Sequence, residues 1–183
     1  NWVLNGACDL VATSGQITAL GATGALPTPT AQHQMVALAD GQVLMTGGLH
    51  ATGEFNSGAS LSATEAAWLF DGTSWGPLPN MNMPRALHSA TLLPDGRVLI
   101  VGGAASASFG GSSAGAWTHD TPVACAEVFD PVDLAFVPLS DCSPSDTSGD
   151  LSTPVASPMV AAGDDLGVLV VGGSDPSNVA SST

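Results

Sequence analysis

Most side chains that could bind a ligand lie in two long segments rich in glycine, serine and alanine, residues 49–64 and 104–122. The candidates are His50, Glu54, Phe55, Phe109, Trp117, His119 and Asp120. Aromatic side chains on an adaptable polar loop are good anchors for a protein or a glycan. The alternative is that these rings fold back and cover the sheets beneath them.

Metal-ligating residue types are present but form no recognised motif. The two histidines of the long segments could meet over a metal, although without paired carboxylates they are a weak signature. A third long segment, 141–155, carries Asp141, Asp146 and Asp150, which could bind Ca²⁺. Their spacing fits no EF-hand loop, and carboxylates capping a solvated loop are the simpler interpretation. We therefore expect no cofactor, with Ca²⁺ as the alternative.

Two of the three cysteines are expected to lie close together. Cys125 begins one predicted strand and Cys142 follows the next, so the intervening hairpin brings them to the same end of the sheet. A disulfide there would close a loop of about 17 residues. It would indicate an extracellular, periplasmic or cell-surface location. Two buried or free thiols are the alternative, and Cys8 should not reach either residue.

Three related phrases supply the strands that position these residues. They are HQMVALADGQVLMTGG (33–48), HSATLLPDGRVLIVGG (88–103) and PMVAAGDDLGVLVVGG (158–173). Each indicates a strand, a turn with Asp and Gly, and a second apolar strand whose composition suggests burial on both faces. The turn pairs are Asp40-Gly41 and Asp95-Gly96, and the phrases end in Gly47-Gly48, Gly102-Gly103 and Gly172-Gly173. A glycine pair there permits close backbone approach.

A second hairpin phrase follows each of the first two, AWLFDGTSW (67–75) and AEVFDPVDLAF (126–136), and NWVLNGACDLV (1–11) has the same shape. Each unit therefore has four strands, with tight first and third connections and a long middle one. Units of about 50 residues with four strands are typical of a propeller blade. His33 and His88 occupy equivalent positions, so we interpret both as structural hydrogen-bonding residues.

The phrases PRALHSATLLPDGRVLIVGG and AEVFDP resemble the kelch repeat, especially its bacterial form. The resemblance implies an all-β fold of kelch-type β-propeller blades, each a four-stranded antiparallel sheet. Galactose oxidase resembles this repeat family and uses a copper centre with tyrosine ligands and a Tyr–Cys cofactor. This chain contains no tyrosine, so that chemistry is excluded within these residues.

The repeat divides the chain into four segments. Residues 1–30 are expected to hold the last two strands of a preceding blade plus a linker, 31–83 a kelch blade, 84–155 a kelch blade with long loops, and 156–183 the first two strands of a following blade. That is an incomplete ring of about three blades, whereas closed propellers usually have roughly four to eight. Either the remaining blades belong to a longer parent chain, or a second copy closes the ring.

Composition narrows the possible partners. Sixteen acidic residues face two arginines and no lysine, a net charge of −14, which disfavours nucleic acid. No apolar run approaches the roughly 20 residues of a membrane span. Because the middle connections share one face, we expect a non-catalytic extracytoplasmic protein that binds a protein or glycan there. The alternatives are a fragment of a galactose-oxidase-like enzyme and a structural component of a surface assembly.

Overall fold

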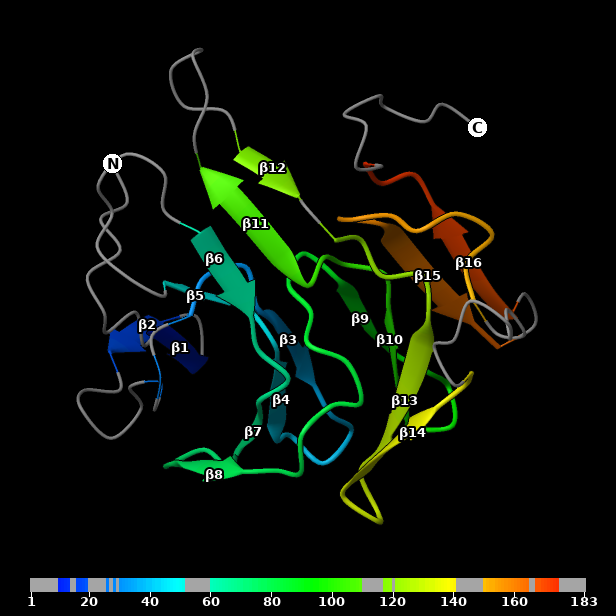
Figure 1. Cartoon of the computed structure of the whole chain (residues 1–183). Helices are drawn as coiled ribbons and strands as arrows, with labels where there is room; N and C mark the ends of the chain where they lie inside the picture. Colours follow the sequence, from blue (N-terminus) through cyan, green and yellow to red (C-terminus); the bar gives the residue numbers. More distant parts are fainter. Residues whose placement is uncertain are drawn as a thin grey trace.

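The computed structural model describes residues 10–13, 16–19, 26, 28, 30–51, 60–109, 117–119, 121–140, 150–164 and 167–174. Within these residues the structure contains β-strands and no helix, and the strands form antiparallel sheets (Figure 1). The all-β, four-stranded architecture expected from the repeats is therefore confirmed.

Two sheets correspond to the two complete repeats. The first repeat sheet contains β3 (Gln34–Ala37), β4 (Val43–Thr46), β7 (Ala67–Phe70) and β8 (Trp75–Pro77), in that order. The second repeat sheet contains β9 (Ser89–Leu92), β10 (Val98–Val101), β13 (Ala126–Asp130) and β14 (Ala135–Pro138). The third phrase forms a hairpin of β15 (Met159–Gly163) and β16 (Gly167–Val171), here called the third repeat hairpin.

A third four-stranded sheet arises where the sequence analysis expected long loops. Its strands are β5 (Leu49–Ala51), β6 (Ser60–Ala63), β11 (Ser106–Phe109) and β12 (Trp117–His119), in the order β12-β11-β6-β5. We call it the insert sheet, because one hairpin comes from the middle connection of each complete repeat. Local composition favours loops here, but pairing of β6 with β11 satisfies the backbone groups of both segments.

The structure describes a hairpin near the N-terminus that overlaps only the end of the predicted one. Strands β1 (Leu10–Thr13) and β2 (Gln16–Ala19) pair with each other, whereas the expected turn at Asn5 falls outside the described residues. The predicted hairpin at 1–11 is thus untested in its first half.

The Asp-Gly turns of the first two repeats have the same geometry. The Gly41 amide donates to the Leu38 carbonyl at 3.0 Å, and the Asp40 carboxylate accepts from the Gln42 amide at 3.0 Å. Only the glycine has a positive φ, +88°. This is a type I turn followed by a left-handed glycine, rather than a turn in which both Asp and Gly have φ above zero. Gly96 repeats it at φ +89°.

The repeats pack side by side through their first strands. Strand β3 lies beside β9, and β9 lies beside β15. Between the two repeat sheets lies an apolar core of Leu38, Leu44, Met81, Val98, Ile100 and Phe129. The opposite face of the second repeat sheet packs Leu99, Val101, Ala126 and Val128 against Val160 and Val170 of the third repeat hairpin.

Backbone hydrogen bonds repeat at each step between units. Residues Gln32, Leu87 and Ser157 hold the same repeat position, and all have positive φ of 58°, 54° and 56°. The Leu87 amide donates to the Gln32 carbonyl at 3.1 Å, and the Ser157 amide donates to the Leu87 carbonyl at 2.6 Å. Three equivalent residues adopt this strained backbone conformation. The hydrogen bonds between neighbouring units therefore hold the backbone in it.

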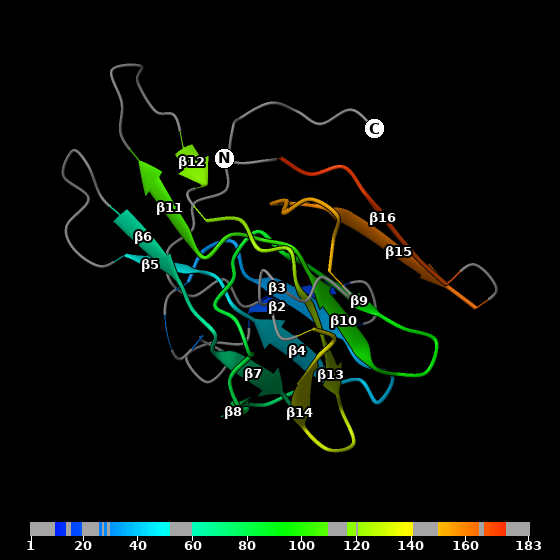
Figure 2. The ribbon, with the colours of Figure 1, turned by 45° about the vertical axis from the view of Figure 1, so that its right-hand side comes forward.

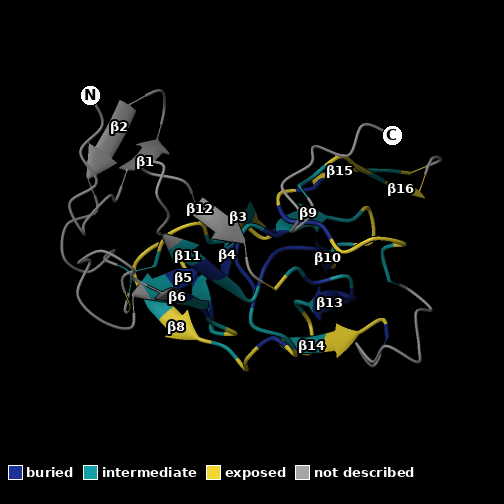
Figure 3. Ribbon diagram, turned by 45° about the horizontal axis from the view of Figure 1, so that its top comes forward, coloured by how far each residue is buried: buried dark blue, intermediate teal, exposed yellow. Residues whose placement is uncertain are grey.

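Burial differs sharply between the equivalent second strands. All four residues of β10 are buried, as its continuous apolar run predicts, whereas four of the five residues of β16 are exposed (Figure 3). The expectation that β16 is buried on both faces is therefore wrong for this structure, since among the described residues only one of its faces is covered, by the second repeat sheet.

Candidate functional site

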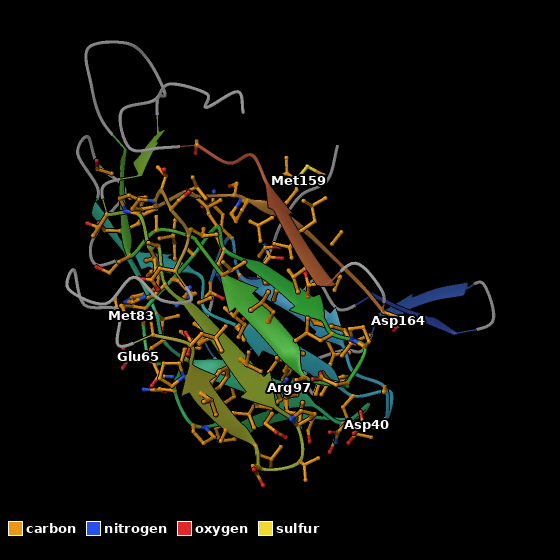
Figure 4. The ribbon with its side chains drawn as sticks, turned by 90° about the vertical axis from the view of Figure 1, so that its right-hand side faces the viewer. Asp40, Glu65, Met83, Arg97, Met159 and Asp164 are labelled. Atoms are coloured by element: carbon orange, nitrogen blue, oxygen red, sulfur yellow. The ribbon has the colours of Figure 1, made fainter. Side chains whose placement is uncertain are left out.

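The insert sheet lies at one end of the repeat sheets (Figure 2). The tight turns lie at the other end: in Figure 4 the turn residues Asp40, Arg97 and Asp164 lie on the opposite side of the molecule from Glu65 and Met83. Beneath the insert sheet, Leu49, Leu61, Ala63, Ala86 and Ala107 form a buried cluster. The face that was predicted to carry the binding segments therefore carries a β-sheet, and this sheet packs on a buried apolar cluster.

The structure describes only some of the candidate ligand-binding residues. Phe109 of β11 pairs directly with Trp117 of β12, and His119 pairs with Ala107. The structure does not describe the side chains of Phe109, Trp117 and His119. His50 is partly buried on β5. Glu54, Phe55, Asp120, Asp141 and Asp146 lie outside the described residues, and Asp150 accepts a 2.5 Å hydrogen bond from the Ser140 hydroxyl.

The register separates the two candidate metal-binding histidines. His50 lies on β5 and His119 on β12, the two opposite edges of the insert sheet. Three strand spacings place their backbones about 14 Å apart, too far for one metal ion. Among the described residues, no three His, Cys, Asp or Glu side chains gather in the way that a metal site needs.

A pocket of about 220 Å³ opens beside β5 and the first repeat sheet. Its lining residues are mostly small or apolar, with one imidazole and one indole: Thr28, Thr30, Met45, Gly47, His50, Thr64, Ala66 and Trp68. His50 is the one predicted ligand-binding residue in this lining. A second pocket, of about 400 Å³, lies over the first strands of the three units, with Gln34, His88 and Met159 in its wall.

The second repeat contains a fully buried ion pair. Nη2 of Arg85 lies 3.0 Å from Oε1 of Glu127, and the two side chains are 0% and 1% exposed. Nη1 of Arg85 donates to the carbonyls of Gly102 and Cys125, both at 3.0 Å. Oε2 of Glu127 accepts from the backbone and side-chain amides of Asn82, at 2.8 and 2.9 Å. Burial lowers the pKa of Arg85, and the Glu127 carboxylate opposes that effect.

The equivalent histidines are both partly or fully buried. Nε2 of His88 shares a 2.8 Å hydrogen bond with the Thr46 hydroxyl of the first repeat sheet. Burial is the largest cause that lowers the pKa of His88 to about 3, and the Arg85 charge adds to it. Burial also lowers the pKa of His33, whose Nδ1 lies 3.5 Å from the Thr30 hydroxyl. Both side chains thus lie within hydrogen-bonding distance of a threonine hydroxyl. The hydrogen bond of His88 links two repeats.

Cys125 is disulfide-bonded, and its Sγ lies 3.9 Å from Nη2 of Arg85. The other half of this disulfide lies outside the described residues, as does Cys142. The pairing with Cys142 therefore stays a prediction.

Sequence reasoning did not single out the Arg85–Glu127 pair. A signal was available, because Glu127 interrupts the apolar run of β13 and Arg85 is one of only two arginines. A charge at a position where the strand pattern predicts burial needs a partner. Because 42 positions in the sequence separate the two residues, local patterns could not identify Arg85 as the partner of Glu127.

The fold is similar to that of a solved fungal alcohol oxidase of the AA5 family, described as in complex with copper. The superposition has a TM-score of 0.59 at 21% sequence identity and covers 83% of this chain. This chain spans only 29% of the length of that oxidase. No protein-family model matches the sequence, and no curated protein matches it. The likeness therefore establishes the all-β fold alone.

Proposed function

We propose that the chain is part of a kelch-type β-propeller whose insert sheet binds another macromolecule, a protein or a glycan. The pairing of β6 with β11 carries this proposal, because it joins the inserts of two consecutive repeats into one sheet. The buried cluster beneath the sheet holds it in place. A binding surface on a rigid scaffold loses less conformational entropy on binding than separate flexible loops do.

The packing of successive units supports the propeller arrangement. The first strands of successive units lie side by side, as blades around a common axis require. Among the described residues no helix is long and apolar enough to cross a membrane. The disulfide at Cys125 favours an extracellular, periplasmic or cell-surface location.

The test is a shortened second insert. Residues 110–116 are replaced by Asn-Gly, which keeps β11, β12 and the β6–β11 pairing. Peptides selected by phage display on the wild-type protein, and hits from a glycan array, are then measured against the variant. We expect most binders to lose affinity for the shortened insert and to retain it for a control variant, Asp95→Ala, at the opposite end of the second repeat sheet. If most binders retain affinity for the shortened insert, the result would contradict the proposal.

The likeness to the AA5 oxidase favours a second candidate, a segment of a propeller oxidase whose active residues lie beyond this chain. Copper content and hydrogen peroxide release with primary alcohols, measured on the longest product of the gene, test it. Copper-dependent peroxide release would support this candidate, and a copper-loaded protein that is inactive would exclude an oxidase of that kind.

Exposed apolar residues on the third repeat hairpin favour a third candidate, assembly through open ends. Met159, Leu169 and Val171 are 77%, 61% and 46% exposed. Further blades, or a second copy, would cover them. Light scattering at several concentrations tests the second copy: a mass that stays at one chain excludes it.

A further inference from the structure

The first repeat lacks the buried ion pair of the second repeat at the same positions. Aligning PTAQH (29–33) with PRALH (84–88) places Thr30 at the position of Arg85. Strand register places Trp68 at the position of Glu127, because Met45 pairs with Trp68 as Ile100 pairs with Glu127. Both members of the pair are therefore replaced at once.

The space that Arg85 fills in the second repeat corresponds to a pocket among the described residues of the first. The guanidinium of Arg85 is held by the carbonyls of Gly102 and Cys125. Their equivalents in the first repeat, Gly47 and Ala66, line the pocket of about 220 Å³. One water needs only ~10–15 Å³ of such volume, so the pocket has room for a small organic ion.

The pocket is reachable and offers a site for positive charge. Trp68 is partly exposed, whereas Glu127 is 1% exposed. Tryptophan is the aromatic side chain that best attracts a cation over its ring face, and arginine is the most frequent partner. The net charge of −14 adds a long-range attraction for cations.

We propose that this pocket binds a guanidinium group, presented as an arginine side chain by a partner. The ligand takes the place that Arg85 occupies in the second repeat: its planar group lies against the Trp68 indole, and its N–H groups donate to the Gly47 and Ala66 carbonyls. Because none of the described residues that line the pocket carries a carboxylate, binding is weak for one side chain and gains strength when a partner makes further contacts. This site is independent of the insert-sheet proposal.

The experiment is an NMR titration of the ¹⁵N-labelled protein with Nα-acetyl-arginine methylamide. We expect saturable shifts of the Trp68 indole and the Thr30 amide, and none with the uncharged isostere Nα-acetyl-citrulline methylamide. Trp68→Leu should weaken binding about tenfold, and Trp75→Phe, outside the pocket, should leave it unchanged. Equal shifts with both ligands, or unchanged affinity of Trp68→Leu, would overturn the proposal.

A second variant keeps the test decisive if Trp68→Leu fails to fold. Thr30→Arg supplies the guanidinium from the chain itself, so it should abolish the shifts caused by the free ligand. Adding Trp68→Glu rebuilds the ion pair of the second repeat, and a double-mutant cycle of melting temperatures should show that the two changes stabilise one another. A folded Thr30→Arg protein that still binds the arginine ligand would rule out the pocket as the site.

Discussion

The second repeat sheet and the third repeat hairpin contain closely related phrases, yet they differ in what covers them. Leu99 and Val101 of β10 are 7% and 3% exposed, whereas Leu169 and Val171 at the same positions of β16 are 61% and 46% exposed. A Cβ on Gly102 would lie 2.8 Å from the Val155 carbonyl, whereas one on Gly172 would meet none of the described residues within 4 Å. The same residues therefore stabilise the fold only where a following unit packs on them.

The largest effect on stability is expected from the buried ion pair of the second repeat. Arg85→Ala leaves the Glu127 carboxylate buried without its cation, which should lower the free energy of unfolding by about 3–5 kcal/mol. Urea denaturation followed by circular dichroism measures it. The control is Arg97→Ala, which removes the other arginine, 48% exposed and paired with Asp95, and should change stability little. Equal losses for the two variants would contradict the role given to burial.

Truncating the matched leucines tests the comparison directly. Leu99→Ala should cost about 2–5 kcal/mol, because it leaves a cavity between two units. Leu169→Ala should stay within about 0.5 kcal/mol, as for other surface positions. Chemical denaturation of the two variants under identical conditions gives both values. A large loss for Leu169→Ala would mean that a second copy or another segment covers β16 in solution.

The pH dependence of stability should come mainly from His88, which is buried between the first two repeats. His88 has a folded pKa of about 3 against an ordinary value of 6.5, so the unfolded chain binds its proton first as pH falls. Stability is therefore complete above pH 6.5 and falls below it, by up to about 1.4 kcal/mol per pH unit, until pH approaches 3. His88→Gln should flatten the slope between pH 6.5 and 5, and His33 accounts for part of what remains. An unchanged slope would show that folding does not lower the pKa of His88.

Of the two matched pairs, the glycines are expected to show the smaller difference. Gly102 and Gly172 both have φ of +70°, so alanine is strained at either position to the same degree. Gly102→Ala adds a close approach to the Val155 carbonyl and should cost about 1–3 kcal/mol more than Gly172→Ala. Melting temperatures compare the two variants. If both lose the same stability, the contact between units imposes no steric limit at this glycine.

Particular residues show how far the sequence predicts the structure. The strands on both sides of Asp40-Gly41 and Asp95-Gly96 form close to where the pattern places them, because a turn and its flanking alternation are local. The insert strands β5, β6, β11 and β12 were not predicted, because segments rich in glycine, serine and alanine have low strand propensity. The two inserts join through pairing of residues that lie 44 to 48 positions apart, from Ser106 with Ser62 to Ser108 with Ser60. The segments that carry the candidate residues therefore emerge at the predicted end of the units, but they contain strands where loops were expected.

The sequence by itself determined the repeating hairpins, their glycine pairs and the end of each unit from which the inserts emerge, because turn chemistry and apolar periodicity act over a few residues. Only the tertiary structure decided which copies are buried, that Arg85 meets Glu127, and that Thr30 and Trp68 leave an open pocket at the same place. Those outcomes depend on contacts between distant segments, and near-identical phrases acquire different surroundings when the units pack.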